Sequence, residues 1–491
     1  MNGKKIFASI SIFIMLITIF SGISMHADDS EKNLDENNRD FHGYNSLTTE
    51  LQEIASTYSN IARLYDLGHS VQDRIIWGLK ITDNPDIEEN EAEIRFCGCH
   101  HGDEYMSVEL PLLLAWDLVQ NYTLDPVITD YVDNREIWII PLVNPDGREM
   151  GQRRNANNVD LNRDYGYMWD GAGSSSSPFS QPETQIIREH ALDNNIVLSY
   201  SYHTAAQYVN YIWNYKPQPT PDEPWIMMIS EEYGDLSGYV PIAGYDWYQT
   251  TGDTNDFSYG CYGGIDTTIE TLNSNIPSEW NRNRDAMLYA LDIADMGLTG
   301  IVTDAITGDP LKATIWVEEN YWPCFTDPNI GDYYKPLFEG YYHVHFRANG
   351  YEEQVKTITI TDANASNILN AALYPSDGYY AYQVTMCEYF DHNTNPSEGI
   401  SALGPPDNIP ASLGNNGMMV LDMGNTSEIV DGIEDDFTIY EADEESEGYQ
   451  VYVSNKWNGP WSSLGPGFGT TSFDLEDVGL ETARFVKIED D

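Results

Sequence analysis

The sequence predicts an α/β fold with a mixed, mostly parallel sheet flanked by helices, followed by two all-β sandwich modules. Two observations support this prediction. From about residue 43 to residue 297, strand-like runs alternate with helix-like runs, which is the pattern of parallel strands joined by helices. From Gly297 onward the helical periodicity stops, and short alternating runs bounded by Gly, Asn and Asp follow, as in all-β modules. A chain of 491 residues is long enough for two or three domains.

The first region, which we assign to residues 43–297, contains elements of both kinds. Apolar or alternating runs predict strands, and apolar residues at helical spacing predict helices. The clearest strands cover 93–96, 136–143 and 195–203, and the clearest helices cover 48–58, 105–119 and 283–296. Because strands and helices succeed one another, helices are expected on both faces of the sheet.

The β-rich part divides into two modules. The first, residues 298–375, contains "GIVTDAITGDPL" and ends at a break near "YPSDGYY". The second, residues 376–491, contains strand-like segments such as "GMMVLDMG" and "YQVYVSN". The sequence stops on the strand-like "ARFVKIEDD", which leaves open whether the last sheet is complete.

The amino terminus has the pattern of a secretion signal. Lys4 and Lys5 precede the apolar run "IFASISIFIMLITIF", and small residues follow it. We therefore predict a signal peptide over residues 1–27 and an acidic linker over 28–42. An uncleaved anchor is the alternative, but the run is short for a spanning helix and no comparable segment follows. The mature protein is expected to be secreted, with no membrane span.

The charge balance excludes some partners. The chain has 79 acidic and 24 basic residues, a formal net charge of −55, and the acids are spread over all regions. This charge argues against nucleic acid and anionic membranes as partners. This charge is compatible with a saline habitat, where salt screens the repulsion between the acidic residues. It is equally compatible with a secreted protein that is simply very soluble.

The five cysteines are too few for a disulfide scaffold, and their odd number leaves at least one unpaired. Cys97 and Cys99 are two apart on a predicted strand and point to the same face, so a bond between them would be strained. The remaining pairing cannot be assigned.

Candidate metal ligands gather in the stretch Cys97–Glu104, on a predicted strand-to-helix turn. His101 and Glu104 are three residues apart and can converge on one ion. His100 and Asp103 have the same spacing, so spacing alone does not choose between the pairs. A site with two histidines and one glutamate needs another imidazole. The best candidate is His203, at the end of the strand predicted over 195–203.

Other polar residues are candidates for binding and catalysis. Arg153, Arg154, Asn162 and Arg163 concentrate guanidinium and amide groups in a chain poor in arginine, and such groups suit two-pronged binding of a carboxylate. Surface ion pairing is the alternative in so acidic a protein. Glu270 lies within a β-branched run, where a carboxylate is costly unless it has a function or a partner.

Taken together, these motifs resemble the zinc metallocarboxypeptidase family. The set "HGDE", "NPDG", "RRN…VDLNRD", "SYH", "WYQTTGDTNDFSY" and "IET" occurs in the family's order within residues 43–297. The resemblance implies that His101, Glu104 and His203 are zinc ligands, which decides between the two pairs. It also implies that Asp160 orients the first histidine ligand.

The resemblance assigns the remaining roles by position. Arg153 corresponds to the arginine that polarises the scissile carbonyl. Asn162 and Arg163 correspond to the pair that holds the terminal carboxylate of the substrate, and Tyr248 to the tyrosine that closes over it. Glu270 corresponds to the general base and acid. The expected function is a secreted, zinc-dependent carboxypeptidase that hydrolyses the C-terminal peptide bond of peptides or proteins.

The resemblance is strongest to the regulatory branch of the family, which includes carboxypeptidases N, E and M. That branch lacks a large inhibitory propeptide, and the segment before residue 43 is too short for one. It also carries a transthyretin-like β-domain after the catalytic domain, and residues 298–375 resemble that domain. Its expected role is structural support.

Two departures from the family pattern concern specificity. Asp103 stands where the carboxypeptidase A branch has an arginine that contacts substrate. Asn255 stands where the family lines the pocket for the final side chain, and it is neither apolar nor acidic. Asp253 and the negative charge of the chain favour a basic terminal residue, and a neutral or broad preference is the open alternative.

Two other functions are compatible with parts of the sequence. A peptidase or amidase for cell-wall stem peptides is one alternative, and a non-catalytic surface-binding protein is another. The last module, 376–491, is on architecture alone a glycan-binding or surface-attachment domain. Its many acids allow Ca²⁺ binding, although a solvated acidic face explains them equally simply.

Overall fold

The computed structural model describes residues 41–363, 365–388, 399–406, 409–414, 416–441 and 448–490. The predicted signal peptide and nearly all of the acidic linker lie outside these residues. Within the described ranges, none of the helices combines the length and the apolar character that a bilayer crossing needs. The domain boundaries proposed from the sequence stay predictions.

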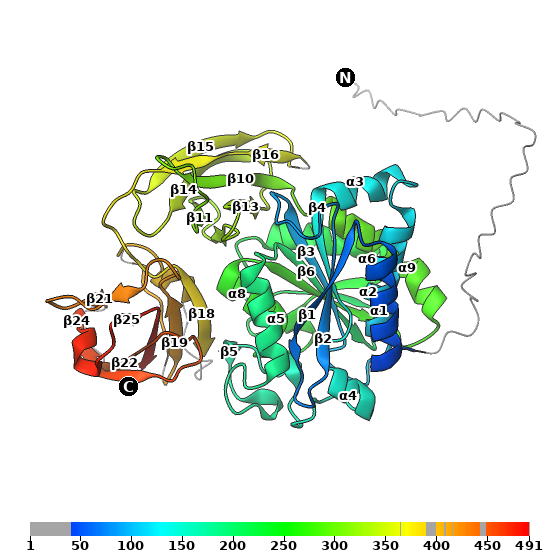
Figure 1. Cartoon of the computed structure of the whole chain (residues 1–491), viewed down its shortest axis with the longest axis horizontal. Helices are drawn as coiled ribbons and strands as arrows, with labels where there is room; N and C mark the ends of the chain where they lie inside the picture. Colours follow the sequence, from blue (N-terminus) through cyan, green and yellow to red (C-terminus); the bar gives the residue numbers. More distant parts are fainter. Residues whose placement is uncertain are drawn as a thin grey trace, which may run out of the picture. The chain divides into compact units, whose positions relative to one another are not determined.

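An eight-stranded mixed sheet forms the centre of the first region (Figure 1), which confirms the predicted fold class. Its strand order is β1-β2-β4-β3-β6-β9-β7-β8. The pairs β3-β4, β3-β6, β6-β9 and β7-β8 are parallel, and the pairs toward β1 and between β7 and β9 are antiparallel. The strands are β1 Ala62–His69, β2 Ile75–Ile81, β3 Ala92–Gly98, β4 Arg135–Ile140, β6 Leu198–Thr204, β7 Tyr208–Tyr211, β8 Val240–Ala243 and β9 Ile265–Thr271.

Helices cover both faces of this sheet, as expected from the alternating pattern. In Figure 1, α1, α2 and α9 lie on one side of the strands, and α5 and α8 lie on the other. The helices are α1 Tyr44–Thr57, α2 Met106–Asn121, α3 Pro126–Asn134, α4 Pro145–Met150, α5 Pro182–Asp193, α6 Glu223–Ser237, α7 Gly244–Trp247, α8 Thr254–Tyr262 and α9 Ile276–Asp292.

The position of α9 differs from the prediction over 283–296. The helix begins at Ile276, because the Asn275 side chain accepts a hydrogen bond from the Ser278 N–H and Pro277 occupies the first turn. The first turns carry few apolar residues, so the apolar periodicity did not mark this start. The N-cap asparagine and the proline were the available signals.

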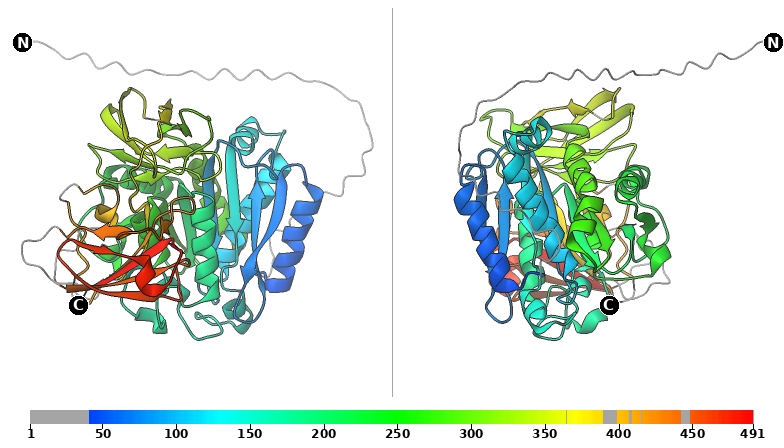
Figure 2. Two further views of the ribbon diagram at one scale, coloured as in Figure 1. Left: turned by 60° about the vertical axis from the view of Figure 1, so that its left-hand side comes forward. Right: turned by 90° about the vertical axis from the view of Figure 1, so that its right-hand side faces the viewer.

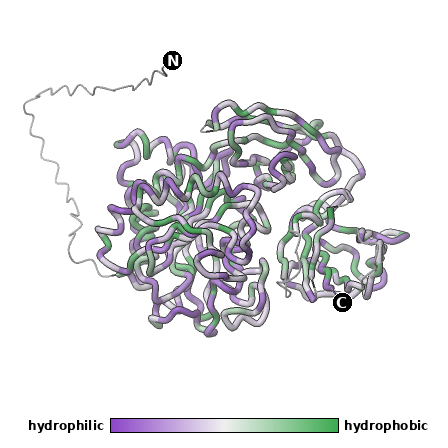
Figure 3. The backbone as a smooth tube through the Cα atoms, turned by 180° about the vertical axis from the view of Figure 1, so that it is seen from behind, coloured by the Kyte–Doolittle hydropathy of each residue, from purple (hydrophilic) through white to green (hydrophobic). Residues whose placement is uncertain are grey.

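The central strands are buried on both faces. Every residue of β3 and of β9 is buried, which is the environment that parallel strands adopt between two layers of helices. In Figure 3, hydrophobic stretches of the chain concentrate toward the interior of this region, and hydrophilic stretches lie mainly at its periphery. A polar side chain at the end of such a strand is therefore held in a rigid, dry setting.

Three neighbouring strands bring their carboxyl ends to one edge of the sheet. β6 pairs in parallel with both β3 and β9, so that Cys97 lies opposite Ser201 and His203 lies opposite Glu270. The loop that follows β3 leads directly into α2, and His101 lies in this loop. Ligands of open α/β folds bind at this edge.

The region after α9 forms two smaller sheets, in the orders β13-β10-β16, with β17 also paired to β10, and β12-β11-β14-β15. Leu298, Val302, Ile315, Val344 and Phe346 are fully buried between them. The strands are β10 Gly297–Asp304, β11 Thr314–Val317, β12 Cys324–Phe325, β13 Asp332–Lys335, β14 Gly340–Arg347, β15 Gln354–Ile360, β16 Ser366–Ile368 and β17 Ala371–Leu373.

Specific contacts join this β region to the helices of the first region. The Trp322 ring stacks on Tyr259 at a centroid distance of 4.6 Å, and its indole N–H donates to the Tyr259 carbonyl. The Lys335 ammonium lies 2.5 Å from an Asp222 carboxylate oxygen, and both side chains are buried. The β region is thus fixed against α8 and the start of α6.

The carboxyl-terminal region is built around a six-stranded sheet of order β23-β22-β26-β19-β18-β5. In Figure 2 (left) its red strands lie beside α5, where the Arg188 guanidinium is 4.0 Å from the Trp457 ring centroid. Two-stranded sheets β20-β25 and β21-β24 accompany it. The strands are β18 Gln383–Glu388, β19 Met418–Asp422, β20 Ile429–Val430, β21 Phe437–Ile439, β22 Gly448–Ser454, β23 Ser462–Phe468, β24 Thr471–Phe473, β25 Thr482–Ala483 and β26 Phe485–Asp490.

One strand of this last sheet comes from the first region, which the sequence analysis did not anticipate. β5, residues Tyr167–Trp169, pairs in parallel with β18 through Tyr167 and Cys387. The segment is only three residues long and lacks strand periodicity, so its pairing depends on the partner strand. The two regions therefore share one sheet.

All five cysteines are buried, and Cys97, Cys99, Cys261 and Cys324 form no disulfide. The prediction that Cys97 and Cys99 do not form a disulfide is confirmed. Cys97 belongs to β3, whereas Cys99 lies just beyond its end with a φ of +58°. Burial raises the pKa of the Cys97 thiol to about 12, so this thiol is not reactive at neutral pH.

His42, near the beginning of the described residues, contacts α1 and α2. Its Nδ1 lies 2.8 Å from a carboxylate oxygen of the buried Glu109, and its Nε2 lies 2.9 Å from Glu50. Burial alone would lower the pKa of His42, but these two carboxylates outweigh it and raise the pKa to about 9. The imidazolium is therefore the form that the fold stabilises.

We expect the stability contribution of His42 to depend on pH. Because its pKa is raised on folding, the contribution is complete below about pH 6.5 and is lost as the pH rises through about 9. His42→Gln should lower the free energy of unfolding by about 1–3 kcal/mol at pH 6 and by clearly less at pH 10. Urea unfolding of both proteins at the two pH values measures this, and an equal difference at both would contradict it.

Candidate active site

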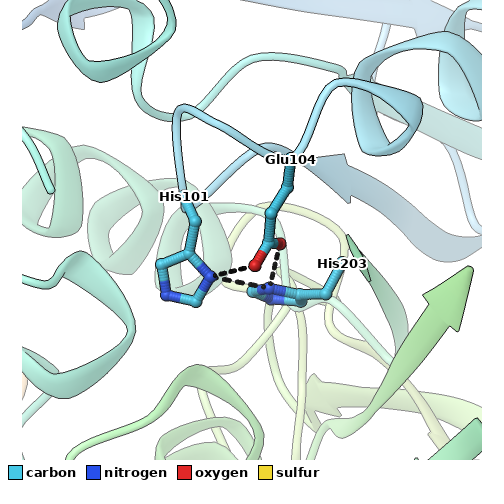
Figure 4. A group of neighbouring side chains, drawn as sticks. All are labelled: His101, Glu104 and His203. Carbon is cyan, nitrogen blue, oxygen red and sulfur yellow. Dashed lines mark hydrogen bonds and ion pairs between the residues drawn. The ribbon is translucent and has the colours of Figure 1, made fainter. Parts of the chain in front are cut away.

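Two histidines and a glutamate converge at the carboxyl edge of the central sheet (Figure 4). His101 Nδ1 lies 2.8 Å from Glu104 Oε1, and His203 Nδ1 lies 2.9 Å from Glu104 Oε2. The two imidazole nitrogens are 3.2 Å apart, and all three side chains are buried. His101 and Glu104 come from the loop between β3 and α2, and His203 comes from β6.

The glycine between the two loop ligands is required by close packing. A Cβ atom on Gly102 would lie 2.0 Å from the backbone carbon of Gly147, and the Gly102 N–H donates to the Arg153 carbonyl. A side chain at this position would push the loop away from α4 and displace the carboxylate of Glu104.

The competing pair of the same spacing is not part of this group. His100 is fully buried, its ring stacks on His203 at a centroid distance of 5.6 Å, and its Nε2 lies 2.9 Å from the Tyr165 hydroxyl. Asp103 is exposed. Neither of them lines the cavity described below.

The donor set fits a zinc ion. Two imidazole nitrogens and one carboxylate are ligands that Zn²⁺ prefers, and in a tetrahedral site with bonds of about 2.0–2.1 Å the ligand atoms lie about 3.3 Å apart. The measured separation of 3.2 Å between His101 Nδ1 and His203 Nδ1 agrees with this value. His101 also places Nε2 3.0 Å from Asp160 Oδ1, which fixes the ring and its tautomer as such carboxylates do in metal sites.

The charges of the group support one another. Burial alone would raise the pKa of Glu104, but the adjacent His101 and His203 hold it well below its usual range. The pKa of Asp160 is lowered in the same way, against burial, by His101 and Arg153. Both carboxyl groups are therefore ionised in the folded protein at neutral pH.

A cavity of about 160 Å³ opens beside this group. Its lining includes every residue to which the sequence analysis gave a role in the site except Asp160, which lies behind His101. The lining residues from that set are His101, Glu104, Arg153, Asn162, Arg163, His203, Tyr248, Asp253, Asn255 and Glu270. Arg154 does not line the cavity, and its guanidinium donates to the Asn158 carbonyl and the Ser174 hydroxyl.

Three basic or amide side chains lie on one side of the cavity. The Arg153 Nε donates to Asp160 Oδ2 over 3.0 Å, and its Nη1 lies 3.6 Å from Glu104. The Asn162 Oδ1 accepts a hydrogen bond from the Thr254 N–H, which turns its NH₂ group away from α8. Arg163 donates to the Asn162 carbonyl. These groups offer several N–H donors to an anionic ligand.

Tyr248 stands at the mouth of the cavity. It follows the short helix α7, its side chain is 48% exposed, and its ring contacts Trp247 at a centroid distance of 4.7 Å. An exposed tyrosine on a loop has room to move toward a ligand.

Glu270 is the penultimate residue of β9 and lies opposite His203 on β6. Its side chain is only 7% exposed, and among the described residues its carboxylate has no hydrogen-bond partner. Burial raises the pKa of Glu270 to about 8, and the nearby Glu104 adds to the rise. A buried carboxylate that faces a cavity without a partner is a candidate base.

The two residues predicted to set specificity are engaged in local hydrogen bonds. Asp253 caps α8 by accepting from the Asp256 N–H, and its other oxygen accepts from the Thr250 hydroxyl. The Asn255 amide donates to the Asp266 carbonyl and accepts from the Thr268 hydroxyl. Both line the cavity, and these local hydrogen bonds hold both side chains in place.

Two further asparagines line the cavity and were missed by the sequence analysis. Asn210 lies on β7 and Asn214 in the loop that follows, and each residue is 5% exposed. Among the described residues no hydrogen bond satisfies either side-chain amide. Only the pairing of β7 with β9 brings them beside Glu270, so no local sequence signal could have identified them.

Comparison with known proteins agrees with this geometry. The sequence matches the family model described as zinc carboxypeptidase over residues 47–284. This segment contains the central sheet, both histidines, Glu104 and Glu270. The chain belongs to the zinc carboxypeptidase family.

Curated relatives indicate the branch of the family, because carboxypeptidases D, Z and M are among the proteins that match this chain. Human carboxypeptidase D is 31% identical over 373 residues, 67% of this chain and 27% of that protein. Chicken carboxypeptidase Z is 28% identical, over 65% of this chain and 59% of that protein. Mouse carboxypeptidase M is 28% identical, over 65% of this chain and 81% of that protein. The chain thus matches about a quarter of the length of carboxypeptidase D.

We expect Asp160 to strengthen metal binding through His101. Asp160→Asn keeps the size of the side chain but removes the charge, and loss of such a partner typically weakens metal affinity about 10- to 100-fold. Competition with a chromogenic zinc chelator measures the affinity. Asp103→Asn, next to the ligands but exposed, is the matched control and should bind zinc like the unchanged protein. An equal loss of zinc affinity in both variants would contradict the role of Asp160.

Proposed function

We propose that this protein is a zinc-dependent carboxypeptidase that hydrolyses the C-terminal peptide bond of peptides or proteins. The observation that carries the proposal is the composition of the cavity. One space of about 160 Å³ contains a metal-binding triad, donors for a carboxylate and a buried carboxylate without a partner. Each is needed for this reaction, and few other functions require all three.

The terminal carboxylate of a peptide fits the donors on the arginine side of the cavity. Arg163 and Asn162 present N–H groups that can bind both carboxylate oxygens. Tyr248 can then close over the bound end from the cavity mouth. This places the last peptide bond toward the histidines and leaves the rest of the peptide in solvent.

The chain's own residues carry the proton transfers. A zinc ion held by His101, Glu104 and His203 would supply a Lewis acid that polarises the scissile carbonyl and acidifies a water molecule. Glu270 accepts the proton of the attacking water and passes it to the amine that leaves. Arg153 faces the developing negative charge on the carbonyl oxygen and stabilises it.

Glu270→Gln tests the catalytic role directly. We expect turnover of a blocked peptide to fall about 10²- to 10⁴-fold, the usual contribution of a general acid–base group. Zinc content by metal analysis should stay unchanged, because Glu270 is not a ligand. Near-normal turnover of the variant would refute the assignment. A complete lack of activity in the unchanged, zinc-loaded protein would favour a non-catalytic binding role.

We also propose that the preferred C-terminal residue is neutral and polar. Asp253 was expected to favour a basic residue, but its carboxylate is occupied by the α8 cap and Thr250. The unused polar groups are the amides of Asn210 and Asn214, which can both donate and accept. A side chain with the same capacity, such as glutamine or asparagine, satisfies both amides, whereas a basic side chain would have to reach the Asp253 carboxylate, which α8 and Thr250 already hold.

Matched peptides that differ only in the last residue measure this preference. We expect kcat/KM for a C-terminal Gln to exceed that for Lys, Glu and Phe by about 10-fold, the worth of one or two hydrogen bonds. Asn214→Asp should raise kcat/KM for the Lys peptide, because it adds a negative charge to the cavity. Faster cleavage of the Lys peptide by the unchanged protein would overturn the proposal.

Export and surface contact are further proposals that the sequence supports. The signal-like segment 1–27 supports secretion, and the net charge of −55 argues against nucleic acid as a partner. The carboxyl-terminal β region is proposed to contact glycans or the cell surface, on its architecture alone.

A further inference from the structure

Three carboxylates meet where the central sheet contacts the β10–β17 region, away from the cavity. Glu88 lies in the loop between β2 and β3, Glu93 lies on β3, and Asp327 lies between β12 and β13. One oxygen of each lies within 4.8 Å of the others. Glu93 and Asp327 are each only 4% exposed.

Two of these carboxylates lack the partners that burial demands. Both oxygens of Glu93 are buried without a hydrogen bond, and so is Asp327 Oδ2. The other Asp327 oxygen accepts from the backbone N–H groups of Asn329 and Ile330, at 2.7 and 2.9 Å, so the carboxylate is held in one orientation. An unpartnered buried charge is strongly unfavourable. A ligand that neutralises it would remove this penalty.

The nearest cation does not provide that neutralisation. The Lys80 ammonium lies 2.5 Å from Glu136 Oε2 and 3.2 Å from Glu88 Oε2. Among the described residues, no lysine, arginine or histidine nitrogen lies within 4.0 Å of the Glu93 or Asp327 carboxylates. Glu88, Glu93, Glu136 and Asp327 therefore share one ammonium, and burial together with the neighbouring carboxylates holds the pKa of Glu93 well above its usual range.

We propose that Glu88, Glu93 and Asp327 bind a divalent cation, Ca²⁺. All three offered ligands are hard oxygen donors, and the group contains neither imidazole nor thiolate, which argues against Zn²⁺. Ca²⁺ accepts six to eight oxygens in irregular geometry, including two-pronged carboxylates and water, whereas Mg²⁺ requires a regular octahedron. Three side chains from separate loops and strands suit the less demanding ion.

The other acidic groups of the described chain do not show these features. In the group Glu318, Glu319 and His343 the carboxylates are exposed, and Glu319 pairs with His343. Exposure and an internal partner remove the reason for a bound ion. That group therefore serves as a matched control.

The ion would connect two parts of the chain. Glu93 lies on β3, the strand that leads to His101, and Asp327 belongs to the β10–β17 region. Bound Ca²⁺ would thus hold the β10–β17 region against β3, the strand that leads into the loop with His101 and Glu104. The inference is independent of the proposed hydrolysis, because none of these residues lines the cavity.

Equilibrium dialysis of the full, zinc-loaded chain against Ca²⁺, followed by metal analysis, tests the proposal. The unchanged protein should bind one more Ca²⁺ than Glu93→Gln or Asp327→Asn, while Glu319→Gln should bind as much as the unchanged protein. Ca²⁺ should also raise the melting temperature by about 2–5 °C in the unchanged protein, and not in the two variants. Mg²⁺ should raise the melting temperature of the unchanged protein by less than Ca²⁺ does.

Two outcomes would overturn the proposal. One is equal Ca²⁺ binding by all four proteins. The other is a higher melting temperature of Glu93→Gln without Ca²⁺, combined with no response of the unchanged protein to Ca²⁺, since that pattern indicates protonated carboxyl groups instead of a bound ion. Both substitutions keep the size of the side chain and remove repulsion, so the variants are expected to fold.

Discussion

The parallel pairing of β6 with β3 on one side and β9 on the other is the constraint on which the site depends. It places His203 opposite Glu270 and brings the loop after β3 over both. Side chains alternate between the faces of a strand, so a shift of one residue in this register would turn His203 or Glu270 away from the cavity. The complete burial of β3 and β9 protects the register, because a shifted strand would expose apolar residues or bury polar ones.

The loop between β3 and α2 depends on a second constraint, close packing against α4. Gly102 has no room for a side chain, and Glu104 must reach both histidines from just before the helix begins. Asp160 then holds His101 from behind while Arg153 holds Asp160. The site is therefore a chain of oriented groups, in which each of these side chains is fixed by the next, whereas the Glu270 carboxylate faces the cavity without a partner among the described residues.

Sequence alone predicted the central fold and most of the site because those signals are local. Apolar periodicity marked the strands and helices, and the resemblance of the motifs selected His101 and Glu104 over His100 and Asp103. It did not find Asn210 and Asn214, which have no motif and reach the cavity only through the pairing of β7 with β9. It also could not find Glu93 and Asp327, because their proximity arises from contact between two regions more than two hundred residues apart.

The short strand β5 makes the carboxyl-terminal region part of the structure around the cavity. β5 begins at Tyr167, four residues after Arg163, and its hydrogen-bonding partner β18 belongs to the last sheet. Removing that sheet would leave the backbone of β5 unpaired close to Arg163. The carboxyl-terminal region is therefore not an independent domain on a linker, because its main sheet includes a strand of the first region.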